Sequence, residues 1–144
     1  VRVSRKTAGD RNSIGLVVRD EIKNVCRKYG NHILLNPINF ELPAFEEPES
    51  RKTPVQLPYP LREEYVIRYH LGDMNPTVLP QSADLESPYG AYRFQAEWED
   101  GILKIRKTLT LHAGTVPLEE YTDFFRFVSE IRNHEHTHYN LEIP

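Results

Sequence analysis

The sequence predicts a mainly β domain in which antiparallel strands form a β-sandwich, with one amphipathic helix near the C-terminus. Two observations predict the strands: apolar and polar side chains alternate over residues 65–71, and they alternate again over 92–98. A period of two is typical of half-buried strands. A third observation predicts the helix, since apolar residues recur at helical spacing over 118–131. The apolar stripe of that helix needs a sheet to cover.

The length and composition favour one globular domain with a single core and argue against several classes of function. A chain of 144 residues and 16.8 kDa can bury one core but not two. The net charge of -3 argues against a dedicated nucleic-acid binder. No apolar stretch approaches the roughly 20 residues that span a bilayer, so we expect no membrane insertion by this segment. Because the chain begins at Val1 rather than Met, we expect a fragment whose targeting segment, if any, lies upstream.

The first 29 residues form a lead-in whose structure the pattern leaves open, and the tail of a preceding domain is one interpretation of it. Residues 16–18 look like a strand, whereas Ile22, Val25 and Tyr29 fit helical spacing. The accessory domain itself is assigned to residues 30–144. It opens with a short strand at 32–35, which ends at an Asn-Pro pair.

A proline-rich stretch, residues 37–60, separates this strand from the main sheet. It holds six of the eleven prolines, and proline removes a backbone donor, so we expect an extended surface crossover. Alternating strands then follow, with a further short strand at 77–79. Asp100-Gly101 predicts a two-residue hairpin.

The strand that returns from this hairpin carries one anomaly. Leu103, Ile105, Leu109 and Leu111 share a face that Lys107 interrupts. Three interpretations stay open: the lysine snorkels, it marks a bulge, or it lies near a sheet edge.

A helix is predicted over about 117–132. Proline is tolerated in the first turn, where Pro117 stands, and Asn133 is a plausible C-terminal stop. The apolar stripe consists of Leu118, Tyr121, Phe124, Phe125, Val128 and Ile131. A last short strand follows within 139–143, which completes a sandwich of immunoglobulin-like architecture with a helical cap.

The segment His134-Glu135-His136-Thr137-His138 matches H-E-x-x-H. On a helix, His134 and His138 would bind Zn²⁺ while Glu135 activates the bound water as general base. The motif follows the predicted helix stop, and only six residues come after it, too few for a third ligand on a downstream helix. A zinc-dependent hydrolase is therefore the alternative to a non-catalytic domain, and we assign no catalytic residue.

The same histidines have a simpler interpretation. If residues 134–142 are extended, His134, His136 and His138 project from one face and hold Zn²⁺ or Ni²⁺ weakly and adventitiously. No cofactor is expected beyond this weak zinc. A solvated polar terminus without a role is the remaining interpretation.

Two other sets of residues are candidates for chemistry. Cys26 is the only cysteine and, with a histidine as base, could act as a nucleophile, although a small buried hydrophobe is the expected role. Tyr89, Tyr92 and Trp98 could stack a glycan or peptide, which would make the domain an adhesin-like sandwich. At strand spacing they are also expected to be core and sheet surface.

Several segments, in this order along residues 30–132, resemble a bacterial family. They are Leu34-Leu35-Asn36-Pro37, the stretch from Phe40 to Phe45, residues 54–60 (PVQLPYP), residues 87–92 (SPYGAY) and residues 116–121 (VPLEEY). The family, typical of Bacteroides-like bacteria, has an N-terminal β domain, a central transglutaminase-like core and a C-terminal β-rich domain of unknown function. This chain is similar to that last domain.

The resemblance implies an exported protein with a periplasmic or cell-surface location. The family's catalytic Cys, His and Asp belong to the upstream transglutaminase-like or protease-like core, and no position here matches them. We therefore expect a non-catalytic accessory or interaction domain. Its partners would be the upstream domains of the same polypeptide or another protein.

Overall fold

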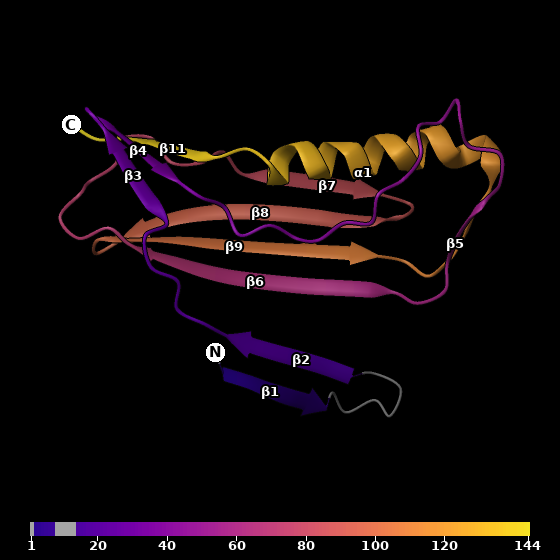
Figure 1. The fold of residues 1–144 in the computed structure, drawn as a ribbon, viewed down its shortest axis with the longest axis horizontal. Coiled ribbons are helices and arrows are strands. Elements are labelled where there is room, and N and C mark those ends of the chain that lie inside the picture. The colour runs from indigo at the N-terminus through magenta and orange to yellow at the C-terminus, as the bar shows by residue number, and fades with distance from the viewer. Residues whose placement is uncertain (1, 8–13) are drawn as a thin grey trace.

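The computed structural model of the chain describes residues 2–7 and 14–144, with side chains placed from Gly15 onward. The chain is mainly β, as predicted, with one α-helix near its C-terminus (Figure 1). Its elements are β1 (Arg2–Thr7), β2 (Ile14–Arg19), β3 (Cys26–Tyr29), β4 (His32–Leu35), β5 (Val55–Leu57), β6 (Leu61–His70), β7 (Ala83–Ser87), β8 (Gly90–Glu99), β9 (Ile102–Leu111), β10 (Gly114–Val116), η1 (Leu118–Glu120), α1 (Tyr121–Glu135) and β11 (Tyr139–Glu142).

The main sheet has four antiparallel strands in the order β6-β9-β8-β7. β8 and β9, two of its three ten-residue strands, are joined by the predicted two-residue hairpin. Asp100 (φ 48°) and Gly101 (φ 78°) both have positive φ, which is the type I′ geometry that matches the twist of the strands it joins. β9 is central and pairs without interruption with β6 and β8.

The second layer combines helix and strands. A three-stranded sheet, β11-β4-β3, lies over one end of the main sheet, and α1 continues the layer toward the other end (Figure 1). The Tyr139 ring packs 6.1 Å from that of Tyr69 and 5.5 Å from that of Phe94. Phe124 of α1 packs 5.4 Å from Tyr89. This antiparallel, sandwich-like arrangement with a C-terminal helix confirms the predicted fold class.

The core lies between these two layers and follows the period of two in the strands. Side chains at 92 and 94 of β8, and at 103, 105, 109 and 111 of β9, are buried, while their neighbours on the outer face are exposed or only partly buried. The helix contributes Tyr121, Phe124, Phe127, Val128 and Ile131. The main sheet therefore has one covered face and one open, polar face.

The structure corrects several details of the prediction. Residues 77–79 form only an isolated bridge, Val78 to Glu142, rather than a strand. The helix does not stop at Asn133 but continues to Glu135, because its last turn is held against the sheet by a buried contact described below. Leu118 lies in η1 and is 41% exposed, so it is not part of the buried stripe.

The N-terminal 29 residues and the crossover also differ from the expectation. Residues 14–19 and 26–29 are strands, and the helical spacing there has no structural counterpart. β3 pairs with β4 inside the domain, whereas β1 and β2 form a separate two-stranded hairpin. The lead-in residues 1 and 8–13 lie outside the described residues. The crossover does not lie wholly on the surface as expected: it contains the short strand β5, which pairs with β10, and its Phe40 is 5% exposed and belongs to the core.

Among the described residues, no helix combines the length and the apolar character needed to cross a bilayer.

Candidate functional site

Lys107 lies at the centre of the covered face of the main sheet. Its side chain is 1% exposed, and its strand is neither an edge nor bulged. The three interpretations of this lysine drawn from the sequence are therefore all wrong. The ammonium group points into the interior, where its Nζ lies 4.7 Å from the Phe40 ring centre and 5.4 Å from that of Tyr65.

Glu135, from the last turn of α1, supplies the countercharge. Its Oε2 lies 2.6 Å from Lys107 Nζ and accepts a 2.7 Å hydrogen bond from the Phe40 backbone N–H. Burial lowers the pKa of Lys107, while the hydrogen bond and charge of Glu135 oppose that shift. One carboxylate thus joins the central strand, the helix end and the crossover.

Tyr92 and His134 complete the network. The Tyr92 hydroxyl donates a 2.7 Å hydrogen bond to Glu135 Oε1. The Tyr92 hydroxyl oxygen also lies 2.8 Å from His134 Nδ1. A phenol has a single proton, so His134 must carry its proton on Nδ1 and donate to the Tyr92 oxygen. Burial, followed by the Glu135 hydrogen bond, raises the pKa of Tyr92.

This network is closed on itself. Lys107, Glu135 and Tyr92 are 1%, 4% and 0% exposed, and every polar atom that Glu135 presents is engaged by a donor. Such an arrangement positions three segments of the fold but offers no free carboxylate or amine to an incoming molecule. Its chemical role is to neutralise charge inside the core.

A signal for this network is present in the sequence. Lys107 interrupts the apolar alternation of its strand without shifting it. Glu135 follows Ile131 by four residues and Val128 by seven, the spacing of the apolar face of the helix. One cation and one anion, each at a core-facing position of a different element, are the pattern expected of a buried pair.

The H-E-x-x-H segment is not arranged as a zinc-hydrolase site. The helix ends at Glu135 with His136 as its C-cap, so His134 and His138 do not share a helical face. Glu135 is bound to Lys107, and the Nδ1 of His134 faces Tyr92. The geometry that activates a metal-bound water is therefore not present in the segment.

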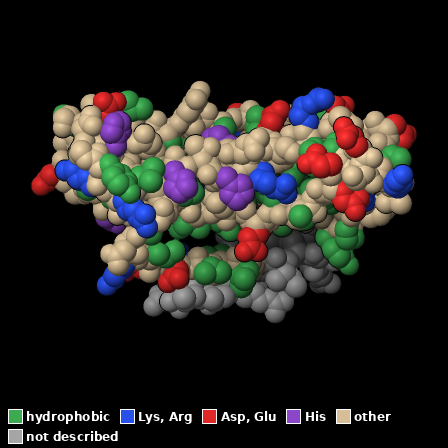
Figure 2. Space-filling model, turned by 45° about the horizontal axis from the view of Figure 1, so that its top comes forward, with side chains coloured by type: hydrophobic (Ala, Val, Ile, Leu, Met, Phe, Trp, Pro, Cys, Tyr) green, Lys and Arg blue, Asp and Glu red, His purple; other side chains and the backbone are tan. Residues whose placement is uncertain are grey.

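The condition for the three-histidine metal site, an extended chain over 134–142, is also not met. His134 is helical and half-buried, while His136 and His138 are exposed in the turn that leads to β11. Figure 2 shows histidine side chains spread over the face it presents. Among the residues that the structure describes, no group of three or more His, Cys, Asp and Glu side chains is placed to hold a metal ion.

The three aromatic residues proposed for ligand binding are not brought onto one open surface. Tyr92 is fully buried under α1. Tyr89 packs on Phe124 and donates a 3.3 Å hydrogen bond to the Glu120 carbonyl. Trp98, six residues along β8 from Tyr92, lies roughly 20 Å away at 3.3 Å per residue.

Cys26 lies in β3 opposite Leu35 and is half-buried. Burial raises the pKa of its thiol, the opposite of what activates a nucleophilic cysteine.

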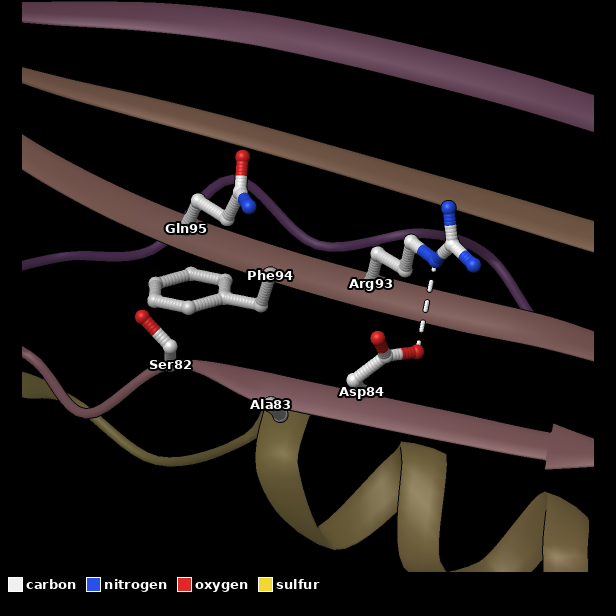
Figure 3. Close-up of a pocket in the computed structure, with 6 residues that line it drawn as sticks. All are labelled: Ser82, Ala83, Asp84, Arg93, Phe94 and Gln95. Carbon is white, nitrogen blue, oxygen red and sulfur yellow. Dashed lines mark hydrogen bonds and ion pairs between the residues drawn. The ribbon is translucent and has the colours of Figure 1, made fainter.

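A pocket of about 280 Å³ lies at the β7–β8 edge of the sheet (Figure 3). Its lining residues are Ser82, Ala83, Asp84, Arg93, Phe94 and Gln95. The Arg93 guanidinium lies 3.3 Å from Asp84 and 3.0 Å from Glu86, and these carboxylates, Asp84 first, raise its pKa. Because two acids already neutralise this cation, the pocket is not prepared for an anionic ligand.

Comparison with known proteins identifies the family of the chain. Residues 31–141, about three quarters of the chain, match the family described as "Domain of Unknown Function with solved-structure structure (DUF3858)". Neither the curated proteins nor the solved structures contain a match to the chain. The matched range contains all five segments on which the resemblance rested, as well as Lys107 and Glu135. The chain belongs to the DUF3858 family, a family of domains of unknown function.

Proposed function

We propose that this chain is a non-catalytic accessory domain, which follows a transglutaminase-like core in an exported bacterial protein and packs against the upstream part of that polypeptide. Periplasmic or cell-surface location is part of the same proposal and rests on the sequence resemblance.

The observation that carries the proposal is the distribution of exposed apolar side chains. Leu16, Val18 and Ile22 are 68%, 56% and 55% exposed and fall within seven positions, at or just after the β1–β2 hairpin. An isolated two-stranded hairpin is marginally stable in water. A hairpin that presents apolar side chains beside an already complete core is expected to be covered by another part of the protein.

The chemistry of the core supports the same conclusion. Its lysine, glutamate and buried tyrosine are engaged with one another, and Arg93 at the surface pocket is neutralised by two acids. Binding through a surface is the function that such an arrangement supports best.

Limited proteolysis of the full polypeptide tests the proposal. Replacing Leu16 and Val18 by Asp should release the hairpin from the upstream part, because each change places a charge in an apolar contact. We expect cleavage near residues 8–25 to become at least several-fold faster in the variant.

The matched control is Tyr59→Asp, because Tyr59 is an 81% exposed apolar residue in the crossover, away from the hairpin. It should leave the cleavage rate unchanged. Equal cleavage rates in the Leu16/Val18 variant and the unchanged protein would contradict the proposal. A thermal melt of each variant separates loss of docking from loss of the fold.

A further inference from the structure

The outer edge of β6 has no described strand paired with it. β6 spans ten residues and pairs only with β9, so among the described strands none occupies its other side. It contains no proline and no bulge, two devices that protect edge strands, but it carries four charged side chains, a third such device, so a partner strand has to match their charges. The opposite edge strand, β7, has only five residues and lies beside α1 (Figure 1).

The outer face of β6 is self-complementary when the strand is paired antiparallel with a copy of itself. With Val66 on the two-fold axis, Glu64 lies opposite Arg68 of the copy, and Arg68 lies opposite Glu64 of the copy. All three residues are exposed, and Val66 is 40% exposed at the centre of the strand. Opposite charges directly across a strand pair are stabilising.

Neighbouring registers lack this complementarity. A shift of the axis to Tyr65 places Arg62 opposite Arg68 of the copy, and a shift to Glu64 places two glutamates opposite each other. When the two-fold axis passes through a residue, each residue lies opposite one from the same face of the other strand. The covered faces of the two sheets then lie on the same side of the dimer. The pattern of charges therefore selects the register centred on Val66.

From this edge and its charge pattern we propose that the chain self-associates through β6, forming a two-fold dimer with a continuous eight-stranded sheet. Edge pairing buries a modest area, so the dimer is a weak, concentration-dependent one. The proposal rests on β6 and not on the hairpin residues Leu16 and Val18. The hairpin lies beyond the same edge (Figure 1), so the dimer requires the hairpin to leave β6 free.

Disulfide trapping tests the register directly. In a Cys26→Ser background, Val66→Cys should form a disulfide-linked dimer under mild oxidation, since directly opposite Cβ atoms lie about 5 Å apart. The matched control is Glu64→Cys on the same face, whose copies would be about 13 Å apart, four residues along the strand. A mixture of Glu64→Cys and Arg68→Cys chains should cross-link, although neither does so alone.

Sedimentation equilibrium measures how much the Glu64–Arg68 pairs contribute to the affinity of the dimer. Glu64→Arg should weaken association by about tenfold, because it places like charges opposite each other twice. Glu64→Arg combined with Arg68→Glu should restore association. A monomer at all concentrations, or equal cross-linking of Val66→Cys and Glu64→Cys, would overturn the proposal. So would an intramolecular disulfide in Val18→Cys/Val66→Cys, since it would assign the edge to the chain's own hairpin.

Discussion

Lys107 shows how a charged residue can occupy the centre of a β-sheet core. Its ammonium group is surrounded by the Glu135 carboxylate and the rings of Phe40 and Tyr65. The aromatic faces carry partial negative charge, which favours a nearby cation. Glu135 in turn accepts hydrogen bonds from Tyr92 and from the Phe40 backbone. The ion pair is therefore compensated on every side, as a pair removed from water must be.

We expect Lys107→Met to destabilise the fold by about 3–5 kcal/mol, because it leaves the Glu135 carboxylate buried without its cation. Lys107→Met combined with Glu135→Gln should recover much of that loss, since a neutral amide can still accept from Tyr92 or Phe40. Urea unfolding of the four chains of this cycle measures the coupling. The exposed Asp123–Arg126 pair is the control, and Asp123→Ala should cost no more than about 1 kcal/mol. Simple additivity of the Lys107 and Glu135 changes would refute the compensation described here.

Buried tyrosines make stability depend on alkaline pH. Burial raises the pKa of Tyr69 from its usual 10.0 to about 12. Because the folded-state pKa is the higher one, the stabilisation is fully present below pH 10 and is lost as pH rises from 10 to 12. Unfolding free energy measured across this window should fall. In Tyr69→Phe the fall should be smaller, and an unchanged slope would count against burial as its cause.

At the scale of elements, the β8–β9 hairpin organises the sheet. Its turn aligns β8 and β9 so that every inward position of one lies opposite an inward position of the other. The turn requires glycine at position 101 for two reasons. Gly101 has a φ of 78°, and a Cβ there would lie 2.5 Å from the Gly72 carbonyl oxygen. The hairpin is thus packed against the loop that follows β6.

Gly101→Ala should therefore destabilise the chain by more than the roughly 1–2 kcal/mol that a left-handed conformation costs a non-glycine residue. Gly30→Ala is the matched control, because Gly30 also has a positive φ (56°) but has open space around its missing Cβ. Thermal or urea unfolding of both variants gives the comparison. Equal losses would mean that the contact with Gly72 adds nothing to the cost of the turn.

At the scale of the molecule, the main sheet is well packed and the β1–β2 hairpin is not. β9 is flanked by a strand on each side and covered by α1 and the crossover, whereas β2 has β1 as its one partner among the described strands. Figure 1 shows the β1–β2 hairpin beyond β6, apart from the two layers. The stability of the chain is therefore concentrated in the main sheet and its covering helix.

Hydrogen exchange should reveal this gradient. In the isolated chain, amides of β9 should exchange slowest, with protection close to that of global unfolding, and those of β2 fastest among the strands, because the hairpin opens locally. Mass spectrometry of peptic fragments after timed labelling measures both. Protection of β2 equal to that of β9 would mean that the hairpin is part of the cooperative core.

Local pattern was sufficient for most of the elements. The alternation in β6, β8 and β9, the Asp100-Gly101 turn and the apolar stripe of α1 each depend on neighbours in the sequence, so they could be predicted from it. The strand at 77–79 and the stop at Asn133 were wrong, because weak local preferences there are overridden by contacts from distant segments. The helix continues to Glu135 since its carboxylate meets Lys107, 28 positions earlier in the chain.

The sequence by itself determined a mainly β fold, its longest strands, its tight turn and its single helix. Only the tertiary structure decided that Lys107 and Glu135 are a buried pair, that Tyr92 is closed to ligands, and that the glutamate of the H-E-x-x-H segment faces the core. The physical reason is that hydrophobic periodicity is encoded within one element. The partner of a buried charge comes instead from another element, and its position is set only when the layers pack.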